Sequence, residues 1–499
     1  MTDKKTIIKL ILSSKMKFAM LILCLGFVSV SSCFSQMTLQ EAVNTATKKN
    51  NGIKACQKTV DYQTSSIAVA KGRYMPTISL EAAYTHMNDD LTIDLNPIRS
   101  AMIQLEVLDQ VNFANMQSML QTGQPLSAEA QAIVQQAALQ QLNAKIPAFE
   151  STMKEQNFPS ASITLQQPIF TGGKIGAGID AAKAQKEMAD AKLNTQVQTV
   201  TTDVVTYYLN VLLAKENLDV RQHIYDGVKK HYNLAEKSLL VGLIANNDKL
   251  RADVALSEAE RNLFEAQQTL EIAKYALASV LEYAEGTLPE PSEKLKFSEP
   301  EITLSQAISD AKHQNVNLLQ LHSAAKALHA KADASKGDYY PTIYGFGKYN
   351  ACRHYLSILD PEWAVGIGLK YDLFTGKRRI NEYEANKSEA ESIEYTALDA
   401  ERKIELLCRT QYMRMNLAKD SYKKLEVTAA QAEENLRLNS KRFEEGLGTS
   451  LEALDAELNL EGVLLKKAAT LSEYFNAMYS LYETAGKSDE FVKFWSNKN

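Results

Sequence analysis

Four segments of the chain alternate apolar and polar residues with the period of a β-strand, and they cover residues 78–85, 161–166, 341–350 and 362–371. The last is the most regular, with Trp363 and Tyr371 at opposite ends of one apolar face. The third is less regular, because Tyr344 and Phe346 fall on the face opposite Ile343. Alternation over roughly ten residues is typical of a strand with one apolar and one wet face, as in membrane barrels. It is equally typical of a soluble hairpin, so the strands alone leave both interpretations open.

The segment from Gly173 to Val241 predicts one very long helix, because it has no proline and, beyond its first turns, a single glycine, Gly227. At about 1.5 Å per residue, such a helix is roughly 100 Å long. Its seam advances in alternating steps of four and three residues through Val200, Val204, Tyr207, Val211, Ala214, Leu218, Arg221, Tyr225, Val228 and Tyr232. A period of 3.5 residues sustained over about five heptads indicates a coiled coil rather than a helix on a globular core.

The chain contains one unit twice. Two motifs, Thr38–Val43 and Lys71–Ile78, recur 265 residues later at Thr303–Ile308 and Lys336–Ile343. Two others, Ile169–Gly172 and Gly242–Leu243, recur 204 residues later at Leu373–Gly376 and Gly446–Leu447. The two offsets differ by 61 residues, which indicates an insertion in the first copy between about residues 90 and 157. We therefore predict a first repeat over residues 36–290 and a second over residues 291–490.

The offset of 204 residues predicts a second long helix in the second repeat. Both long helices are predicted to reverse at glycine-containing turns, Val241–Leu243 and Gly446–Gly448. Glycine supplies the positive φ that a tight helix–helix turn needs. Return helices follow over residues 248–281 and up to about residue 485. Another helix is predicted over residues 304–336, after the prolines that break the first return.

The first 35 residues have the pattern of an export signal. Five lysines precede the apolar stretch Phe18–Val30, which is too short to span a membrane. Cleavage after Ser35 would leave a free N-terminus, whereas cleavage before Cys33 would leave that cysteine to carry acyl chains. Both processing routes take the mature chain out of the cytoplasm.

Composition and charge exclude several classes of function. The net charge of −5 gives no basic surface for nucleic acid. Three cysteines remain beyond the leader, without a CxxC spacing, so we expect buried free thiols rather than disulfides or a zinc site. Catalytic motifs such as a nucleophile elbow, a P-loop or HExxH are missing from the sequence. We therefore expect neither an enzyme nor a bound cofactor or metal.

Beyond residue 35, no apolar run reaches the roughly 18 residues of a membrane-spanning helix. If the chain enters a membrane, it does so as strands. Every backbone group in lipid must be paired, and four strands cannot close a barrel. Several chains would then be required, and a trimer would supply twelve strands.

The order and spacing of these motifs resemble the TolC-like outer-membrane efflux family, over nearly the whole mature chain. The motifs that carry the resemblance are the start at Thr38–Val43, Tyr74–Ile78, Gln167–Gly173, Leu373–Arg379 and the Val241–Leu243 turn. The resemblance implies a mostly α fold with a small β part. A trimeric 12-stranded β-barrel in the outer-membrane lipid would continue as an α-helical coiled-coil tunnel in the periplasm of a Gram-negative bacterium.

The function implied by the resemblance is passive exit. An inner-membrane pump and a periplasmic adaptor would deliver the substrate, as in tripartite efflux or type I secretion. Drugs, polypeptides and metal cations all remain possible cargo. The insertion would lie at the extracellular end, as a partly helical loop from Ser127 to Gln156. The alternative is a periplasmic coiled-coil scaffold or adaptor without a pore.

The resemblance also implies roles for the two turns and for the residues just beyond them. The expected adaptor contacts are Val241, Gly242, Leu243, Gly446, Leu447 and Gly448. The expected periplasmic gate contains Asn247, Asp248, Phe443, Glu452 and Asp455. Three copies of Glu452 and Asp455 would form acidic rings that attract cations and raise some of their own pKa values. The family often carries a tyrosine where this chain has Phe443, and an arginine where it has Gly448. Both changes remove polar groups, so helix packing would hold the closed state more than polar contacts do.

Overall fold

The computed structural model describes residues 36–284, 286–352 and 361–498. This part of the chain forms two compact units. Unit 1 holds the described residues up to Ile67, together with Asp180–Ala330 and the residues from Asn386 onward, and unit 2 holds Ala68–Ile179 and Lys331–Ala385. The predicted leader and the alternative lipidation site at Cys33 lie outside the described residues.

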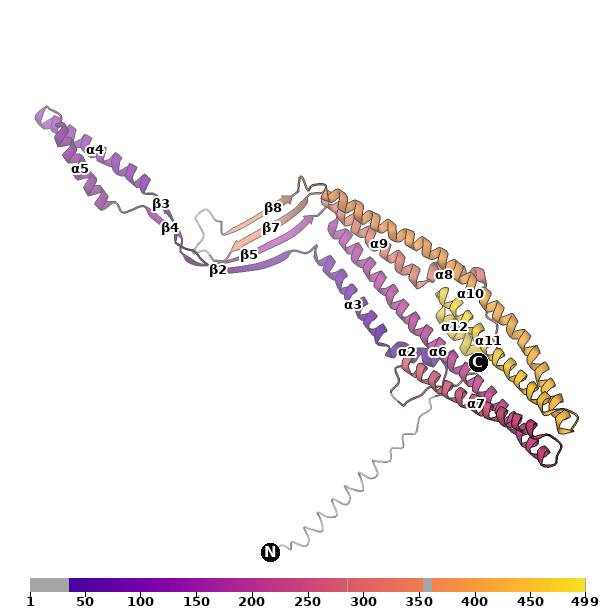
Figure 1. Ribbon diagram of the computed structural model, residues 1–499. Coiled ribbons are helices and arrows are strands. Elements are labelled where there is room, and N and C mark those ends of the chain that lie inside the picture. Colours follow the sequence, from indigo (N-terminus) through magenta and orange to yellow (C-terminus); the bar gives the residue numbers. More distant parts are fainter. Residues whose placement is uncertain (1–35, 285, 353–360, 499) are drawn as a thin grey trace, which may run out of the picture. The chain divides into compact units, whose positions relative to one another are not determined.

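Two helices of 67 residues each, α6 (Lys174–Leu240) and α10 (Arg378–Glu444), dominate the fold (Figure 1). Each is followed by a return helix of 35 residues, α7 (Asn246–Val280) or α11 (Ser450–Thr484). The bounds of the second pair follow those of the first by 204 residues, which is the offset of the sequence motifs. Every predicted seam residue of α6 is buried or half-buried, and so are the residues that follow them by 204 positions in α10, from Ile404 to Leu436, which confirms the seam.

The predicted helix over residues 304–336 is wrong in one respect, because it is two helices, α8 (Leu304–Gln314) and α9 (Val316–Lys336). Asn315 separates them: its side-chain oxygen accepts from the Asn317 amide at 3.0 Å, and its side-chain nitrogen donates to the Thr484 carbonyl at 3.0 Å. Asparagine side chains offer the backbone this kind of local alternative to helix continuation. Asn50 stands in the same position between α2 (Leu39–Lys49) and α3 (Asn51–Gly72).

The repeated motif at Thr38 and Thr303 is a helix start. Each threonine accepts a hydrogen bond from the amide three residues later, and the side chain of Glu41 or Gln306 accepts from the threonine amide. This reciprocal capping box satisfies two of the backbone donors that a helix N-terminus leaves unpaired.

The core of unit 1 is rich in aromatic side chains. Phe475 of α11 packs edge-on against Trp495 with ring centroids 4.8 Å apart, and Tyr479 packs against Phe491 at 5.1 Å. Trp495 and Phe491 belong to α12 (Ser488–Lys498), a helix that the sequence pattern did not predict. Of the three cysteines, Cys408 is buried as expected, whereas Cys56 and Cys352 are only half-buried.

One buried carboxylate joins distant parts of the chain in unit 1. Glu293 Oε2 accepts hydrogen bonds from the Leu39 amide at 3.0 Å, from Tyr208 Oη at 2.6 Å and from Trp495 Nε1 at 2.9 Å. Tyr208 Oη also lies 3.0 Å from the Met37 carbonyl. Beside these contacts, β1 (Gln36–Met37) pairs in parallel with β6 (Glu290–Pro291). Burial and the Glu293 contact raise the pKa of Tyr208, so its phenol stays protonated and donates.

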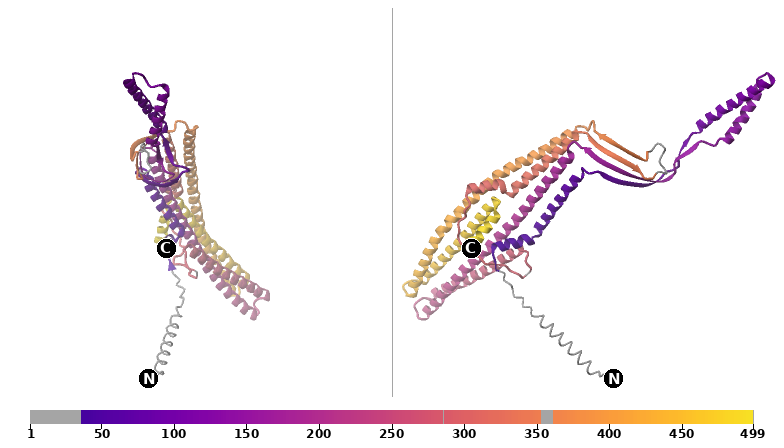
Figure 2. Two further views of the ribbon diagram at one scale, coloured as in Figure 1. Left: turned by 90° about the vertical axis from the view of Figure 1, so that its left-hand side faces the viewer. Right: turned by 180° about the vertical axis from the view of Figure 1, so that it is seen from behind.

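Unit 2 contains a four-stranded antiparallel sheet in the order β2–β5–β7–β8, whose strands are labelled in Figure 1 and seen from two further directions in Figure 2. The strands are β2 (Thr77–His86), β5 (Asn157–Phe170), β7 (Thr342–Asn350) and β8 (Trp363–Lys370). The register aligns apolar residues on one face, and these are largely exposed: Ile78, Leu80, Tyr84, Ile163, Leu165, Tyr349, Trp363, Val365, Ile367 and Leu369. A sheet of this size with an apolar face in solvent needs another surface to cover it.

The irregular third strand has a packing reason. Tyr344 and Phe346 of β7 lie opposite Gly368 and Gly366 of β8, on the other face of the sheet. A Cβ atom at Gly368 would lie 2.5 Å from the Tyr344 ring, and one at Gly366 would lie 2.8 Å from the Phe346 ring. Glycine therefore makes room for each ring, and each ring covers a strand position that has no side chain.

The insertion is more structured than predicted. A helical segment was expected only from Ser127 to Gln156, but the insertion holds two helices, α4 (Asn96–Thr122) and α5 (Ala128–Lys145). They are joined to the sheet through a short antiparallel pair, β3 (Leu91–Asp94) and β4 (Glu150–Lys154). Ser127 caps α5 by accepting from the Ala130 amide. The expectation missed α4 because its apolar residues surround the helix and give little amphipathic signal.

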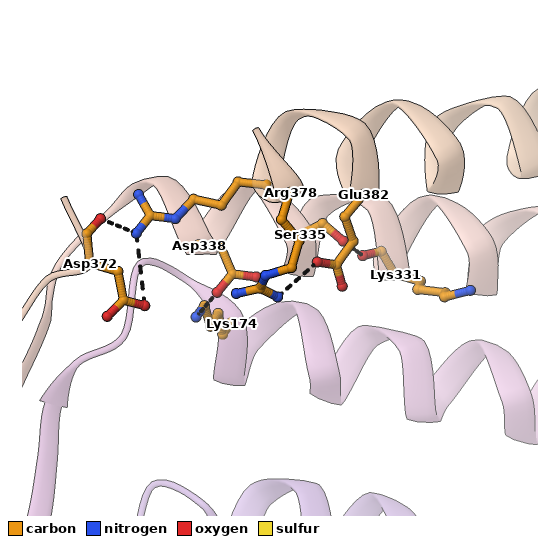
Figure 3. A network of polar contacts seen from close by, with 8 residues as sticks. Lys174, Lys331, Ser335, Asp338, Asp372, Arg378 and Glu382 are labelled. Atoms are coloured by element: carbon orange, nitrogen blue, oxygen red, sulfur yellow. Dashed lines mark hydrogen bonds and ion pairs between the residues drawn. The ribbon is translucent and has the colours of Figure 1, made fainter. Parts of the chain in front are cut away.

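Polar contacts and close glycine packing hold the strand-to-helix junctions of unit 2. Lys174 at the start of α6 pairs with Asp338 of the short helix η1 (Gly337–Tyr339), and Figure 3 shows these side chains pointing toward each other. A Cβ atom on Gly172 would lie 2.5 Å from the Gly337 carbonyl oxygen, so only glycine fits there. The repeated motif ends in glycine in both copies because the backbone has a positive φ at this position, +64° at Gly172 and +60° at Gly376.

Among the residues that the structure describes, none of the helices combines the length and the apolar character required to cross a membrane.

The Glu293 carboxylate generates a stability prediction. Glu293→Leu leaves the Leu39 amide and the Trp495 indole unpaired, whereas Tyr208 keeps the Met37 carbonyl as an acceptor. Each unpaired buried donor costs about 1–3 kcal/mol, so we expect a loss of about 2–6 kcal/mol. Glu293→Gln keeps an acceptor oxygen and should lose less, on the order of 1 kcal/mol. Thermal unfolding of the purified proteins, monitored by circular dichroism, shows whether Glu293→Leu loses more stability than Glu293→Gln. Glu290→Gln is the matched control, since Glu290 makes only a 3.8 Å ion pair with Lys215. Equal melting temperatures for Glu293→Leu and the control would contradict this role.

Candidate functional site

The two turns between long and return helices have the same backbone geometry. Gly242 has φ +74° and Gly446 has φ +72°, as the sequence predicted. The amide of Leu243 donates to the Ser238 carbonyl at 2.8 Å, and the amide of Leu447 donates to the Arg442 carbonyl at 2.8 Å. Together with the glycine amide bonds, these contacts form the Schellman closure of a helix C-terminus. Both turns lie at the same end of unit 1 (Figure 1).

Apolar side chains at the turns face solvent. Val241 is 70% exposed, Leu243 76% and Leu447 71%. Gly448 packs closely against the end of α10, because a Cβ atom there would lie 3.2 Å from the Phe443 amide nitrogen. The turns therefore present a hydrogen-bonded backbone and uncovered apolar groups, which is a surface suited to contact another protein.

Two of the predicted gate acids cap the return helices. Glu452 accepts from the Thr449 amide at 2.9 Å and Asp248 accepts from the Ala245 amide at 3.3 Å, each at the third position of its helix. The pKa of Glu452 lies below its usual value, chiefly because of the Thr449 amide. Within one chain this shift is opposite to the rise that clustered carboxylates would produce. Asp455 is exposed and follows Glu452 by three residues, so both carboxylates lie on one face of α11.

Phe443 packs inside the chain. Its ring is buried and lies 4.6 Å from the His231 ring of α6. His231 Nε2 lies 2.8 Å from Ser450 Oγ at the start of α11, and burial lowers the pKa of this histidine. These residues tie α6 to α10 and α11 near the turns. The sequence analysis missed His231, because one histidine on a helix gives no local signal of its partners.

A groove of about 410 Å³ runs between α6, α7 and α11, and Asn247 lines it. Its walls are mostly apolar, with Leu250 and Val254 from α7 and Leu451 and Leu458 from α11. Asn247 thus lies beside this groove, whereas its neighbour Asp248 caps the start of α7. The structure brings the predicted gate residues to one end of unit 1 but gives them different surroundings.

Two buried glutamates on α11 form a second feature that the sequence analysis missed. Glu461 pairs with Arg221, the polar residue that interrupts the seam of α6. Glu457 is inserted against Gly227, where a Cβ atom would lie 2.1 Å from its carboxylate oxygen. Burial, reinforced by the Glu461 charge, raises the pKa of Glu457 to about 7. Gly227 thus leaves the space in α6 that the Glu457 side chain occupies.

The family described as outer membrane efflux protein matches residues 42–281 and 307–487. The chain belongs to this family. Its members are channel proteins rather than enzymes. The chain is accordingly a protein of the Gram-negative outer membrane that extends into the periplasm.

Curated relatives match parts of the chain. The cobalt-zinc-cadmium resistance protein CzcC of Cupriavidus metallidurans is 29% identical over 131 residues, which are 26% of this chain and 31% of that protein. The probable efflux pump outer membrane protein TtgC of Pseudomonas putida is 30% identical over 103 residues, 21% of this chain and 20% of that one. These matches therefore span between a fifth and a third of the relatives. The alkaline protease secretion protein AprF of Pseudomonas aeruginosa is 21% identical over 343 residues, 66% of this chain and 70% of that protein.

Solved structures share the fold over nearly the full length. The outer membrane protein VceC of Vibrio cholerae superposes with a TM-score of 0.68 at 15% identity, covering 90% of this chain and 96% of that one. The open state of the Neisseria gonorrhoeae MtrE outer membrane channel gives a TM-score of 0.65 at 15% identity, covering 90% and 89%. At these identities the similarity shows the fold alone.

The buried Glu457 carboxylate generates a prediction on pH. Its pKa in the folded chain is about 7 against an ordinary 4.5, so ionising it costs stability as pH rises between these values. The wild-type protein should lose up to about 3 kcal/mol over this range through Glu457. Glu457→Gln has nearly the same shape and no charge, so its stability should lack this decline. Melting temperatures at pH 4.5 and pH 8 measure the difference, with the exposed Glu473→Gln on α11 as the control. A parallel pH dependence in Glu457→Gln and wild type would contradict the assignment.

Proposed function

We propose that three copies of the chain form one channel, in which twelve strands close a barrel in the outer membrane and the long helices form a periplasmic tunnel. The channel would be the exit duct of a tripartite efflux or type I secretion system. The observation that carries this proposal is the open four-stranded sheet of unit 2.

In the described chain, β2 and β8 each pair on one side only. Such edges are unpaired backbone donors and acceptors, which lipid does not tolerate. The apolar face of the same sheet is uncovered. Pairing β8 of one copy with β2 of the next would satisfy both edges and turn the apolar face to lipid. A soluble scaffold would leave this face in water, so we do not favour the alternative.

The long helices support a tunnel. Their seams have a 3.5-residue period, and small residues such as Ala429 and Ala432 let helices approach closely. Their turns carry the exposed apolar residues that an adaptor would cover. The names of TtgC and AprF associate these relatives with an efflux pump and with protease secretion. We extend to this chain the general role, with a periplasmic adaptor and an inner-membrane pump as partners.

The gate belongs to the same proposal. Three copies would bring the exposed carboxylates of Glu452 and Asp455 to the narrow periplasmic end, where acidic rings attract cations. The buried Phe443–His231 contact would hold the two helix pairs of each copy together. Closure would then depend mainly on helix packing.

The turns generate a prediction on docking. Replacing Leu243 and Leu447 together by Glu places charges on the proposed adaptor surface without touching the glycines that shape the turns. In a strain that lacks the native gene, this variant should reach the outer membrane as trimers but lose adaptor co-purification and resistance to toxic export substrates, at least tenfold. Leu243→Met with Leu447→Met keeps the apolar surface and should retain both. Undiminished co-purification and resistance in the Glu variant would refute docking at these turns.

The acidic pair generates a prediction on conduction. Trimers reconstituted in planar bilayers should prefer cations and be blocked by multivalent cations. Glu452→Gln combined with Asp455→Asn should weaken both effects severalfold. Glutamine can still accept at the third helical position, so the cap is kept. The reversal potential in a salt gradient measures selectivity, and Asp61→Asn, an exposed acid on α3, is the control. Unchanged selectivity and block in the double variant would place these carboxylates outside the pore.

A further inference from the structure

Helix α4 of the insertion has two opposite apolar faces. One face packs on α5, where Ile103, Val107 and Ala138 form a small buried cluster. Val111 and Leu142 pack beside it. Figure 1 shows α4 and α5 side by side as a hairpin. This contact accounts for one side of each helix.

The opposite face of α4 is apolar and uncovered. Its large side chains are between 52% and 79% exposed: Ile98, Met102, Leu105, Leu108, Phe113, Met116, Met119 and Leu120. A helix that is apolar on both sides is normally buried on both sides. The α5 helix covers only one of them, so a second partner is needed.

The spacing on the uncovered face indicates what the partner is. Ile98, Met102, Leu105, Asp109, Asn112, Met116 and Met119 follow one another in steps of four and three residues. These are the core positions of three heptads, a pattern that packs against another helix with the same repeat. An irregular partner surface, or a membrane surface, does not require this period.

Two of these positions are polar, and one of them, Asn112, favours identical helices. Asp109 and Asn112 interrupt the apolar stripe in its middle. Asn112 has both a donor and an acceptor, so it pairs best with its counterpart on an aligned copy and fixes the register and number of helices. Ionised Asp109 carboxylates only accept hydrogen bonds and repel one another, so Asp109 lowers the stability of the bundle and does not help to align it. The methionines on either side adapt to the remaining gaps.

We propose that the α4 helices of three copies of the chain pack on one another through this face, as a parallel three-stranded coiled coil with α5 on the outside. This inference rests on the trimer proposed above. Threefold symmetry makes identical helices parallel and places them in register. The insertion is also continuous with the proposed subunit contact, because it follows β2, an edge strand of the sheet.

The bundle would form on the extracellular side. The insertion leaves the sheet after His86 and returns at Asn157, whereas the helices of the tunnel join the opposite strand ends, before Thr77 and after Phe170. The trimer would then have subunit contacts on both sides of the membrane. Substrate leaving the barrel would pass between the legs of the bundle rather than along its axis.

Site-directed cross-linking in the full chain tests the bundle. The parent protein carries Cys56→Ser, Cys352→Ser and Cys408→Ala, and it is displayed in the outer membrane of intact cells. Leu105→Cys and Met116→Cys are introduced separately and treated with a short bismaleimide. Each should give covalent dimers at a yield at least tenfold above that of Gln136→Cys, which lies on the exposed side of α5 away from α4. Adding Leu105→Asp should abolish cross-linking at Met116→Cys.

The mass of the detergent-purified parent, from light scattering, separates the two proposals. A trimeric parent whose Leu105→Cys and Met116→Cys variants give no more dimer than Gln136→Cys would overturn the bundle and leave the channel intact. The same result accompanied by protection of both cysteines from a water-soluble maleimide would assign the face to lipid or another partner, and also overturn it. A monomeric parent would overturn the proposed channel and the bundle with it.

Discussion

A single buried oxygen holds the centre of unit 1 together. Glu293 Oε2 receives donors from the first helix of the first repeat, from α6 and from the last helix of the chain. Glu293 lies in the segment between α7 and α8, so elements from both ends of the chain meet on a residue near its middle. Tyr208 lies near the middle of α6, so its hydrogen bond to Glu293 fixes the middle of that long helix. A buried acceptor with three donors is suited to joining these elements, because removing it leaves the Leu39 amide and the Trp495 indole unpaired.

The elements that depend on local signals could be predicted from the sequence. The seam follows from the 3.5-residue period, and the turns follow from Gly242 and Gly446, whose positive φ is a property of the residue itself. The same holds for the strands, whose alternation survives in the register of the sheet. Even the irregular β7 obeys the rule once Gly366 and Gly368 are seen opposite its aromatic rings.

The remaining features need partners that are distant in sequence. The side-chain amide of Asn315, where α8 ends, donates to the Thr484 carbonyl. The residues near position 315 do not indicate this partner, because it lies 169 residues away in the sequence. Gly227 leaves room for the side chain of Glu457, which lies on a helix about 230 residues away in the sequence. The sequence of α6 alone therefore does not show why residue 227 is a glycine. For α4 the difficulty is different: two apolar faces cancel the periodic signal that a one-sided helix would give. The candidate gate shows the same limit, because sequence placed its acids but not the groups around them.

The chain itself helps to divide the roles of Asp248 and Glu452. Both cap a return helix from its third position, and at the equivalent position of α8 a neutral residue, Gln306, makes the same contact. Capping therefore requires an acceptor oxygen and not a charge. A negative charge at a helix N-terminus adds roughly 0.3–1 kcal/mol through the helix dipole, at either turn. Neither the cap nor the dipole accounts for Asp455, which is exposed and lies beyond the first turn of α11. An electrostatic role for Asp455 therefore rests on the proposed channel, and among the described residues no contact within one chain accounts for its charge.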